Sequence, residues 1–186
     1  GTMGEMHARK ICKILELAEK GRLPVIGIWD GDGQRPHEGV TSLGPNGEIL
    51  DRLVSCSGKV PILSIVLGTV SGTSALAAGL SDFVILGRQR GRMFMRSPYV
   101  IPEIISGEVD EDKLGGATHH ASRSGVACMV SENGSGAFDI AAEILSFLPD
   151  HTMAEPPRLS TGDKWKRKCK GMGKLVPLDS DRPYDM

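Results

Sequence analysis

The chain has 186 residues, of which 40% are apolar and 24% are charged, and its formal net charge is −1. This length and composition are typical of a globular protein with its own hydrophobic core, and the charge argues against nucleic acid as a partner. No apolar run approaches the roughly 20 residues that a membrane-spanning helix needs. We therefore expect neither a membrane protein nor a nucleic-acid-binding protein.

Four cysteines are scattered along the chain without the close spacing of metal ligands: Cys12, Cys56, Cys128 and Cys169. We interpret them as reduced thiols of a cytoplasmic protein, and we expect no metal site.

The first 149 residues alternate between helical and strand-like apolar patterns. In chain order, the patterns predict a helix over 4–20, a strand over 25–29, a helix over 38–56 interrupted at 44–47, a strand over 61–67, a helix over 71–80, strands over 82–86 and 92–95, helices over 97–105 and 114–121, a strand over 125–131 and a helix over 136–148. This alternation predicts an α/β domain over residues 1–149 with a largely parallel sheet.

The character of the chain changes after residue 149. Residues 150–186 contain Pro156-Pro157, a basic run and few large apolar side chains. We expect an extended or partly disordered tail that packs, if at all, on a partner.

Two glycine-rich turns follow the predicted strands at 25–29 and 61–67. The first is Asp30 to Arg35, and the second leads from Val70 into a segment of small residues. Such turns leave backbone N–H groups without a ladder partner, and a helix start favours nearby negative charge. Together they are suited to an oxyanion hole for a thioester, which needs no catalytic side chain. The alternative is that both are only tight packing turns.

The segment VIGIWDGDGQRPHEGVTSL resembles the signature of the biotin-dependent acyl-CoA carboxyltransferases, in which a strand is followed by Asp-Ser-Gly-Gly-Ala-Arg, two residues and Glu-Gly. The matching residues are Asp30, Gly33, Arg35, Glu38 and Gly39. The resemblance continues in collinear order over 4–18, 61–83, 114–127 and 174–186. It implies a crotonase-type spiral of strand-strand-helix units, of which this chain would be a truncated part.

The resemblance also implies where the chemistry takes place. The thioester oxygen would be held by backbone N–H groups near Gly33 and Gln34 on the first turn, and near Gly72 and Thr73 on the second. The candidates for substrate binding are Arg35, Ser71, Ser74, Lys164 and Lys168, the two lysines by contacting coenzyme A phosphates. The alternatives are an Arg35–Glu38 ion pair that braces the turn, and a basic run that is only a solvated tail or contacts an acidic partner.

Two glycines of the family pattern are replaced in this chain. Asp32 and Thr73 stand where the family has glycine. Asp32 would oppose an enolate if it pointed inward, could act as a general base, or could simply form the turn. Thr73 would narrow the acyl pocket. His120, beside Ser122 and Ser124, is either a group that titrates near neutral pH or a structural hydrogen-bonding residue.

The resemblance leaves three functions open. The first is an acyl-CoA carboxyltransferase-like subunit that binds an acyl-CoA or malonyl-type thioester, with coenzyme A thioester as substrate and carboxybiotin supplied by a partner. The second is a biotin-independent decarboxylase or another acyl-thioester enzyme. The third is a non-catalytic subunit that completes a partner's active site. We expect an oligomer, with a second carboxyltransferase-half subunit and a biotin carrier protein as partners.

Overall fold

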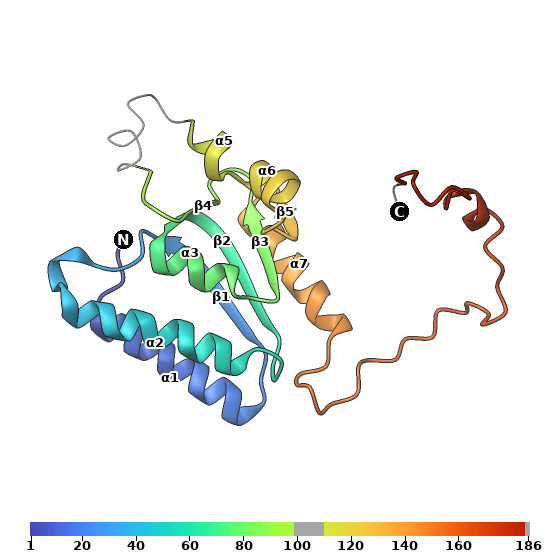
Figure 1. Cartoon of the computed structure of the whole chain (residues 1–186). Helices are drawn as coiled ribbons and strands as arrows, with labels where there is room; N and C mark the ends of the chain where they lie inside the picture. The colour runs from blue at the N-terminus through green and yellow to red at the C-terminus, as the bar shows by residue number, and fades with distance from the viewer. Residues whose placement is uncertain (99–109, 185–186) are drawn as a thin grey trace.

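The computed structural model describes residues 1–98 and 110–184 (Figure 1). Most of the helix predicted over 97–105 lies outside the described residues. The helices are α1 (Glu5–Gly21), η1 (Pro36–Glu38), α2 (Val40–Cys56), α3 (Gly72–Gly79), α5 (Glu111–Gly115), α6 (Ala117–His119), η2 (His120–Ser124), α7 (Gly134–Phe147) and η3 (Met172–Lys174). The strands are β1 (Val25–Gly31), β2 (Ile62–Ser71), β3 (Phe83–Gly87), β4 (Arg92–Phe94) and β5 (Met129–Ser131).

The five strands form one parallel sheet, as the alternating pattern predicts. The strand order is β1-β2-β3-β5, and β4 pairs with the carboxyl end of β2. β2 lies in the centre of the sheet, and every residue from Ile62 to Val66 is almost completely buried. Such a continuous apolar run is typical of a parallel strand that is covered on both faces.

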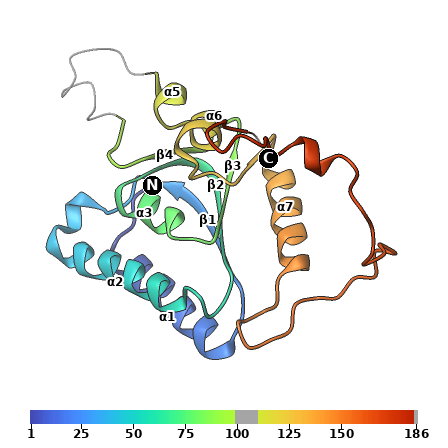
Figure 2. The same cartoon turned by 45° about the vertical axis from the view of Figure 1, so that its right-hand side comes forward.

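Helices cover both faces of this sheet (Figures 1 and 2). On one face, Ile62 of β2 packs with residues of α1 and α2, including Leu15 and Ile49. On the other face, Ile65 packs with residues of α7, including Ala141. The alternation of β2 side chains therefore divides the core into two layers, one on each side of the sheet.

The predicted interruption of the second helix is wrong. α2 runs unbroken from Val40 to Cys56 and contains Pro45. The Gly44-Pro45-Asn46-Gly47 segment favours a turn locally, but the side chain of Asn46 is completely buried and donates to the carbonyl oxygen of Ser42 at 2.8 Å. The segment also contacts α1, where Cys12 Sγ donates to the carbonyl oxygen of Pro45 at 3.8 Å, and such tertiary contacts override the local preference.

The region between β4 and α7 differs in detail from the prediction. The helix predicted over 114–121 is divided into α5, α6 and a π-helical turn, η2, which extends to Ser124. The strand predicted over 125–131 is shorter, because Gly125 has a φ of 71° and ends the turn in the left-handed region. Only Met129–Ser131 pairs with β3.

Residues 150–184 extend from the domain with η3 as their regular element (Figure 1). The amide of Thr152 donates to the carbonyl oxygen of Lys59 at 2.9 Å, and beyond that point the side chains are almost all exposed. None of the helices in the described parts of the chain has the length and hydropathy to cross a bilayer.

Candidate oxyanion site at the ends of β1 and β2

The two glycine-rich turns lie against each other. β1 and β2 are parallel neighbours with Gly31 opposite Val70, so both chains leave the same edge of the sheet. A Cβ atom added to Gly33 would lie 2.6 Å from the carbonyl oxygen of Ser71 and 3.5 Å from the amide nitrogen of Thr73. Gly33 has a φ of 73°, so both its conformation and its surroundings require glycine.

Several amide groups on these turns have no hydrogen-bond partner among the described residues. In the ranges 1–98 and 110–184, the amides of Gly33 and Gln34 donate to no other backbone or side-chain group. On the second turn, α3 begins at Gly72, and the side chain of its N-cap residue, Ser71, accepts no hydrogen bond from the first amides of the helix. A helix leaves its first N–H groups without an intrahelical partner, so the amides of Gly72 and Thr73 have none within α3.

Both departures from the family pattern make hydrogen bonds to other segments. The hydroxyl group of Ser71 donates to Asp32 Oδ1 at 3.1 Å, which joins the first turn to the second. Thr73 Oγ1 donates to Asn46 Oδ1 at 3.3 Å, so the Thr73 side chain bonds to α2. These hydrogen bonds give Asp32 and Thr73 structural contacts between the segments that form the site.

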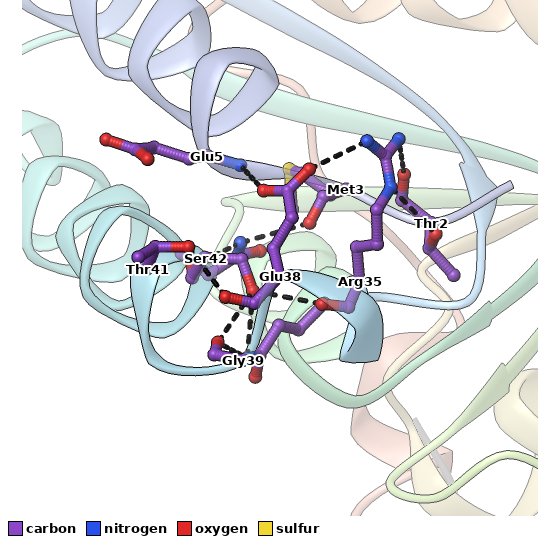
Figure 3. A network of polar contacts seen from close by, with 10 residues as sticks. Thr2, Met3, Glu5, Arg35, Glu38, Gly39, Thr41 and Ser42 are labelled. Atoms are coloured by element: carbon purple, nitrogen blue, oxygen red, sulfur yellow. Dashed lines mark hydrogen bonds and ion pairs between the residues drawn. The ribbon is translucent and has the colours of Figure 1, made fainter.

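Arg35 and Glu38 form the ion pair that the sequence predicts, with 2.8 Å between Nη1 and Oε1 (Figure 3). Arg35 also donates through Nη2 to the carbonyl oxygen of Thr2 at 3.0 Å, and Glu38 Oε2 accepts from the amide of Glu5 at 2.6 Å. The Glu5 amide, and then the Arg35 guanidinium, lower the pKa of Glu38. These contacts join the first turn to the N-terminal segment and α1.

Buried polar side chains behind the turns are functional candidates that the sequence analysis missed. Ser42 and Asn46 on α2 are both completely buried. Gln34 Nε2 donates to Ser42 Oγ at 3.0 Å, and Ser42 Oγ donates to the carbonyl oxygen of Arg35 at 3.1 Å. The only sequence signal at Asn46 was the turn-like segment 44–47, which pointed to the wrong structure.

His120 is held in place by hydrogen bonds at both ring nitrogens. Nε2 lies 3.0 Å from the carbonyl oxygen of Met93, and Nδ1 lies 2.7 Å from Ser124 Oγ. A carbonyl oxygen can only accept, so Nε2 carries a proton. Met93 on β4 pairs with Val70, just before the second turn. His120 therefore contacts β4, the strand that pairs with the end of β2 next to the second turn.

The remaining candidates are divided between the site and the tail. Ser74 is buried and, together with Gly33, lines a cavity of about 490 Å³ beside β1, whose other walls include Ile11 and Trp29. Lys164 and Lys168 are exposed on the extended tail, and neither forms an ion pair or a side-chain hydrogen bond with another described residue. No cluster of His, Cys, Asp or Glu within the described ranges could hold a metal ion.

Comparison with protein families matches the whole chain, residues 1–186, to the family described as "Carboxyl transferase domain". The chain belongs to the carboxyl transferase family. The collinear motifs that include Asp30, Gly33 and Arg35 are therefore signs of common ancestry, and the resemblance seen in the sequence is confirmed.

Curated relatives of this carboxyl transferase chain include subunits of carboxylases and decarboxylases. It is 39% identical to the propionyl-CoA carboxylase carboxyltransferase subunit of Haloferax mediterranei and 37% identical to the methylmalonyl-CoA decarboxylase subunit alpha of Veillonella parvula. Each match covers 100% of this chain and 36% of the relative. The chain therefore spans about a third of the length of these relatives.

A solved structure shows the same fold over nearly all of this carboxyl transferase chain. Transcarboxylase 12S, described as a hexamer with methylmalonyl-coenzyme A and methylmalonic acid bound, matches with a TM-score of 0.86 at 30% identity. The match covers 99% of this chain and 36% of that chain. The parallel α/β sheet described above is therefore the fold of the crotonase-like carboxyltransferases.

Proposed function

We propose that this chain binds an acyl-CoA or malonyl-type thioester and stabilises its enolate for carboxyl transfer. The thioester oxygen would accept hydrogen bonds from the amides of Gly33 or Gln34 on one turn and of Gly72 or Thr73 on the other. The observation that carries the proposal is the close approach of the two turns, with a Gly33 Cβ position only 3.5 Å from the Thr73 amide nitrogen. This closeness supports the proposal that donors from both turns serve one small acceptor.

The chemistry follows from charge development on that oxygen. When the bond between the α-carbon and the carboxylate carbon breaks, its electron pair enters the enolate and negative charge accumulates on the thioester oxygen. Amide donors that are already in place stabilise this charge, and one such donor contributes about 3 kcal/mol in a transition state. In the reverse direction the same enolate carbon attacks the incoming carboxyl group.

The names of the relatives support this substrate class. The two relatives named above are subunits of a propionyl-CoA carboxylase and a methylmalonyl-CoA decarboxylase, and the solved transcarboxylase holds methylmalonyl-coenzyme A. Biotin on a partner would supply or accept the carboxyl group. We expect the chain to work in an oligomer with a second carboxyltransferase half and a biotin carrier protein. The chain would form part of a crotonase-type spiral, and its tail, residues 150–186, would contact a partner.

Decarboxylation is a second candidate, favoured by the 37% identity to a methylmalonyl-CoA decarboxylase subunit. It needs the same enolate, but the carboxyl group leaves as CO₂ and the α-carbon takes a proton. In the direction of carboxylation the α-carbon instead loses a proton, and the Asp32 carboxylate on the first turn, which accepts from Ser71, is the candidate base for that step. His120 contacts the carbonyl oxygen of Met93 on β4 and would act on the site only through that strand. Lys164 and Lys168 remain candidates for contact with coenzyme A phosphates.

Calorimetric titration with malonyl-CoA, methylmalonyl-CoA, acetyl-CoA and free coenzyme A tests the proposal. Because free coenzyme A lacks the thioester carbonyl group that would bind to the two turns, we expect the thioesters to bind about tenfold more tightly. Equal affinity for all four ligands would refute the site. Mass analysis with free biotin present then separates carboxyl transfer from release of CO₂.

Replacing the backbone amide N–H of Gln34 by an ester oxygen removes one hydrogen-bond donor and leaves the Gln34 side chain unchanged. We expect a loss of about 100-fold in turnover. The matched control is the same replacement at Thr161 in the tail, which should leave turnover unchanged. A full rate from the Gln34 ester would show that this donor is not used.

A further inference from the structure

Asn46 lies where the N-terminal segment, α2 and α3 meet. Its side chain is completely buried. Nδ2 donates to the carbonyl oxygens of Met3, at 3.3 Å, and Ser42, at 2.8 Å, while Oδ1 accepts from Thr73 Oγ1 at 3.3 Å. Two carbonyl acceptors on one side and a hydroxyl donor on the other fix the orientation of the amide group. Asn46 therefore joins two other segments, the N-terminal segment and α3, to its own helix.

The N-terminal segment contacts the first turn, and α3 contains Thr73, one of the proposed donors. Met3 pairs with the first turn on both sides of Gln34, because its amide donates to the carbonyl oxygen of Gly33 at 2.6 Å and its carbonyl oxygen accepts from the amide of Arg35 at 3.0 Å. Thr73 carries one of the proposed donors on the second turn. A continuous path of hydrogen bonds thus connects Gly33 and Arg35, the two neighbours of Gln34, to the Thr73 side chain through Met3 and Asn46.

We propose that Asn46 is a positioning residue that fixes the distance between the two halves of the oxyanion hole. The inference rests on the proposed function and adds to it the side chain that sets the geometry of the donors. Asn46 needs no contact with substrate for this. It acts through Met3 on the first turn and through the Thr73 hydroxyl on the second.

This arrangement also gives Thr73 a role that differs from narrowing the acyl pocket. The Thr73 hydroxyl is engaged by α2, and the Ser71–Asp32 hydrogen bond provides a second connection between the turns. A misplacement of about 1 Å at a reacting centre can cost about 100-fold in rate, so connections of this kind matter for catalysis even when the fold survives without them.

The test uses the whole 186-residue chain and the carbonyl stretching band of ¹³C-labelled acetyl-CoA. Hydrogen bonds to the carbonyl oxygen lower the frequency of this band, so the shift on binding reports the position of the donors. The variants are Asn46→Asp, which keeps the acceptor for Thr73 but cannot donate to Met3 or Ser42, and Thr73→Val, which keeps the Thr73 amide and the side-chain shape. Thr73→Ser restores the hydroxyl group, and Thr118→Val is a matched control at an exposed threonine.

We expect the native chain to shift the band, Thr73→Val and Asn46→Asp to lose most of that shift, and Thr73→Ser and Thr118→Val to keep it. If Asn46→Asp fails to fold, Thr73→Val decides, because Thr73 is only partly buried. A full shift in a folded Thr73→Val variant would overturn the positioning role and leave the proposed function intact. Absence of both thioester binding and a shift in the native chain would overturn both proposals.

Discussion

The carboxylate of Glu38 accepts a hydrogen bond from the amide of Glu5 at 2.6 Å, so a residue beyond the first turn caps the start of α1. The N-cap residue itself, Gly4, has no side chain to do this. A Cβ atom on Gly4 would collide with the Glu38 carboxylate and would lie 2.8 Å from Arg35 Nη1. Glycine at position 4 thus makes room for a cap that comes from elsewhere in the sequence.

This cap predicts a dependence of stability on pH. The Glu5 amide, and secondarily Arg35, lower the native pKa of Glu38 below its ordinary value of 4.5. A carboxylate with a lowered native pKa stabilises the fold above the unfolded pKa, and that contribution is lost as the pH falls through the native pKa. Glu38→Gln should therefore lower the free energy of unfolding near neutral pH and have progressively less effect below pH 4.5.

Urea unfolding of both proteins between pH 3 and pH 7 measures this difference. Glu132→Gln is the control, because the Glu132 side chain is 72% exposed in its ion pair with Arg88. A Glu38→Gln difference that is constant over the whole pH range would show that the carboxylate does not cap α1.

Gly33→Ala should disturb both turns. Alanine at a φ of 73° costs about 1–2 kcal/mol on its own. At Gly33 the added Cβ would also meet the carbonyl oxygen of Ser71 at 2.6 Å. Gly58→Ala is the matched control, since Gly58 has a φ of 74° and no atom within 4 Å of the added Cβ.

Thermal unfolding and thioester titration of the two variants separate strain from contact. We expect Gly58→Ala to lose about 1–2 kcal/mol of stability and no affinity. Gly33→Ala should lose more stability and the preference for thioester over free coenzyme A. Equal losses in both variants would mean that the contact between the two turns has no energetic consequence.

The elements that could be predicted from the sequence are those that local patterns determine. The apolar strands predicted at 25–29 and 61–67 are present as β1 and β2, because apolar runs that lead into glycine-rich turns are strong strand signals. Both strands continue beyond the predicted ends, to Gly31 and Ser71, before the turns begin. The Arg35–Glu38 ion pair also followed from local spacing. The pairing of β1 with β2 then brings the two turns together.

The residues that sequence analysis missed depend on contacts between distant segments. Asn46 bonds to Met3, 43 residues away, and to Thr73, 27 residues away. A glycine-proline-asparagine-glycine segment gives no sign of these partners, and taken alone it favours a turn. Contacts with distant segments favour the helix instead: Pro45 accepts from Cys12 on α1, and Asn46 bonds to Met3 and Thr73.

The four cysteines should differ in reactivity. Cys12 and Cys56 are buried, and burial raises the pKa of both thiols, while Cys128 and Cys169 are exposed. Because the thiolate is the reactive form, the two exposed residues should be alkylated quickly and the two buried residues only on unfolding. Iodoacetamide labelling followed by peptide mass mapping, with and without urea, measures this. Rapid labelling of Cys12 in the native protein would contradict the packing of α1 on α2.

Ser64 should be important for stability because it connects β1 to the segment after α3. Trp29 Nε1 donates to Ser64 Oγ at 2.8 Å, and the hydroxyl groups of Ser64 and Ser81 lie 2.6 Å apart. Ser64→Ala removes the shared partner of both groups at a site that is 1% exposed, and leaving a buried donor unpaired costs about 1–3 kcal/mol.

Ser81→Ala is the matched control, because it leaves the acceptor of Trp29 in place. The second tryptophan, Trp165, is 89% exposed, so a Trp165→Phe background makes Trp29 the only tryptophan, with a stability change of no more than about 0.5 kcal/mol. In that background, urea unfolding followed by Trp29 fluorescence should show a larger loss for Ser64→Ala than for Ser81→Ala. Equal losses would mean that the Trp29 hydrogen bond contributes nothing beyond the backbone pairing and apolar packing that hold β1 against β2.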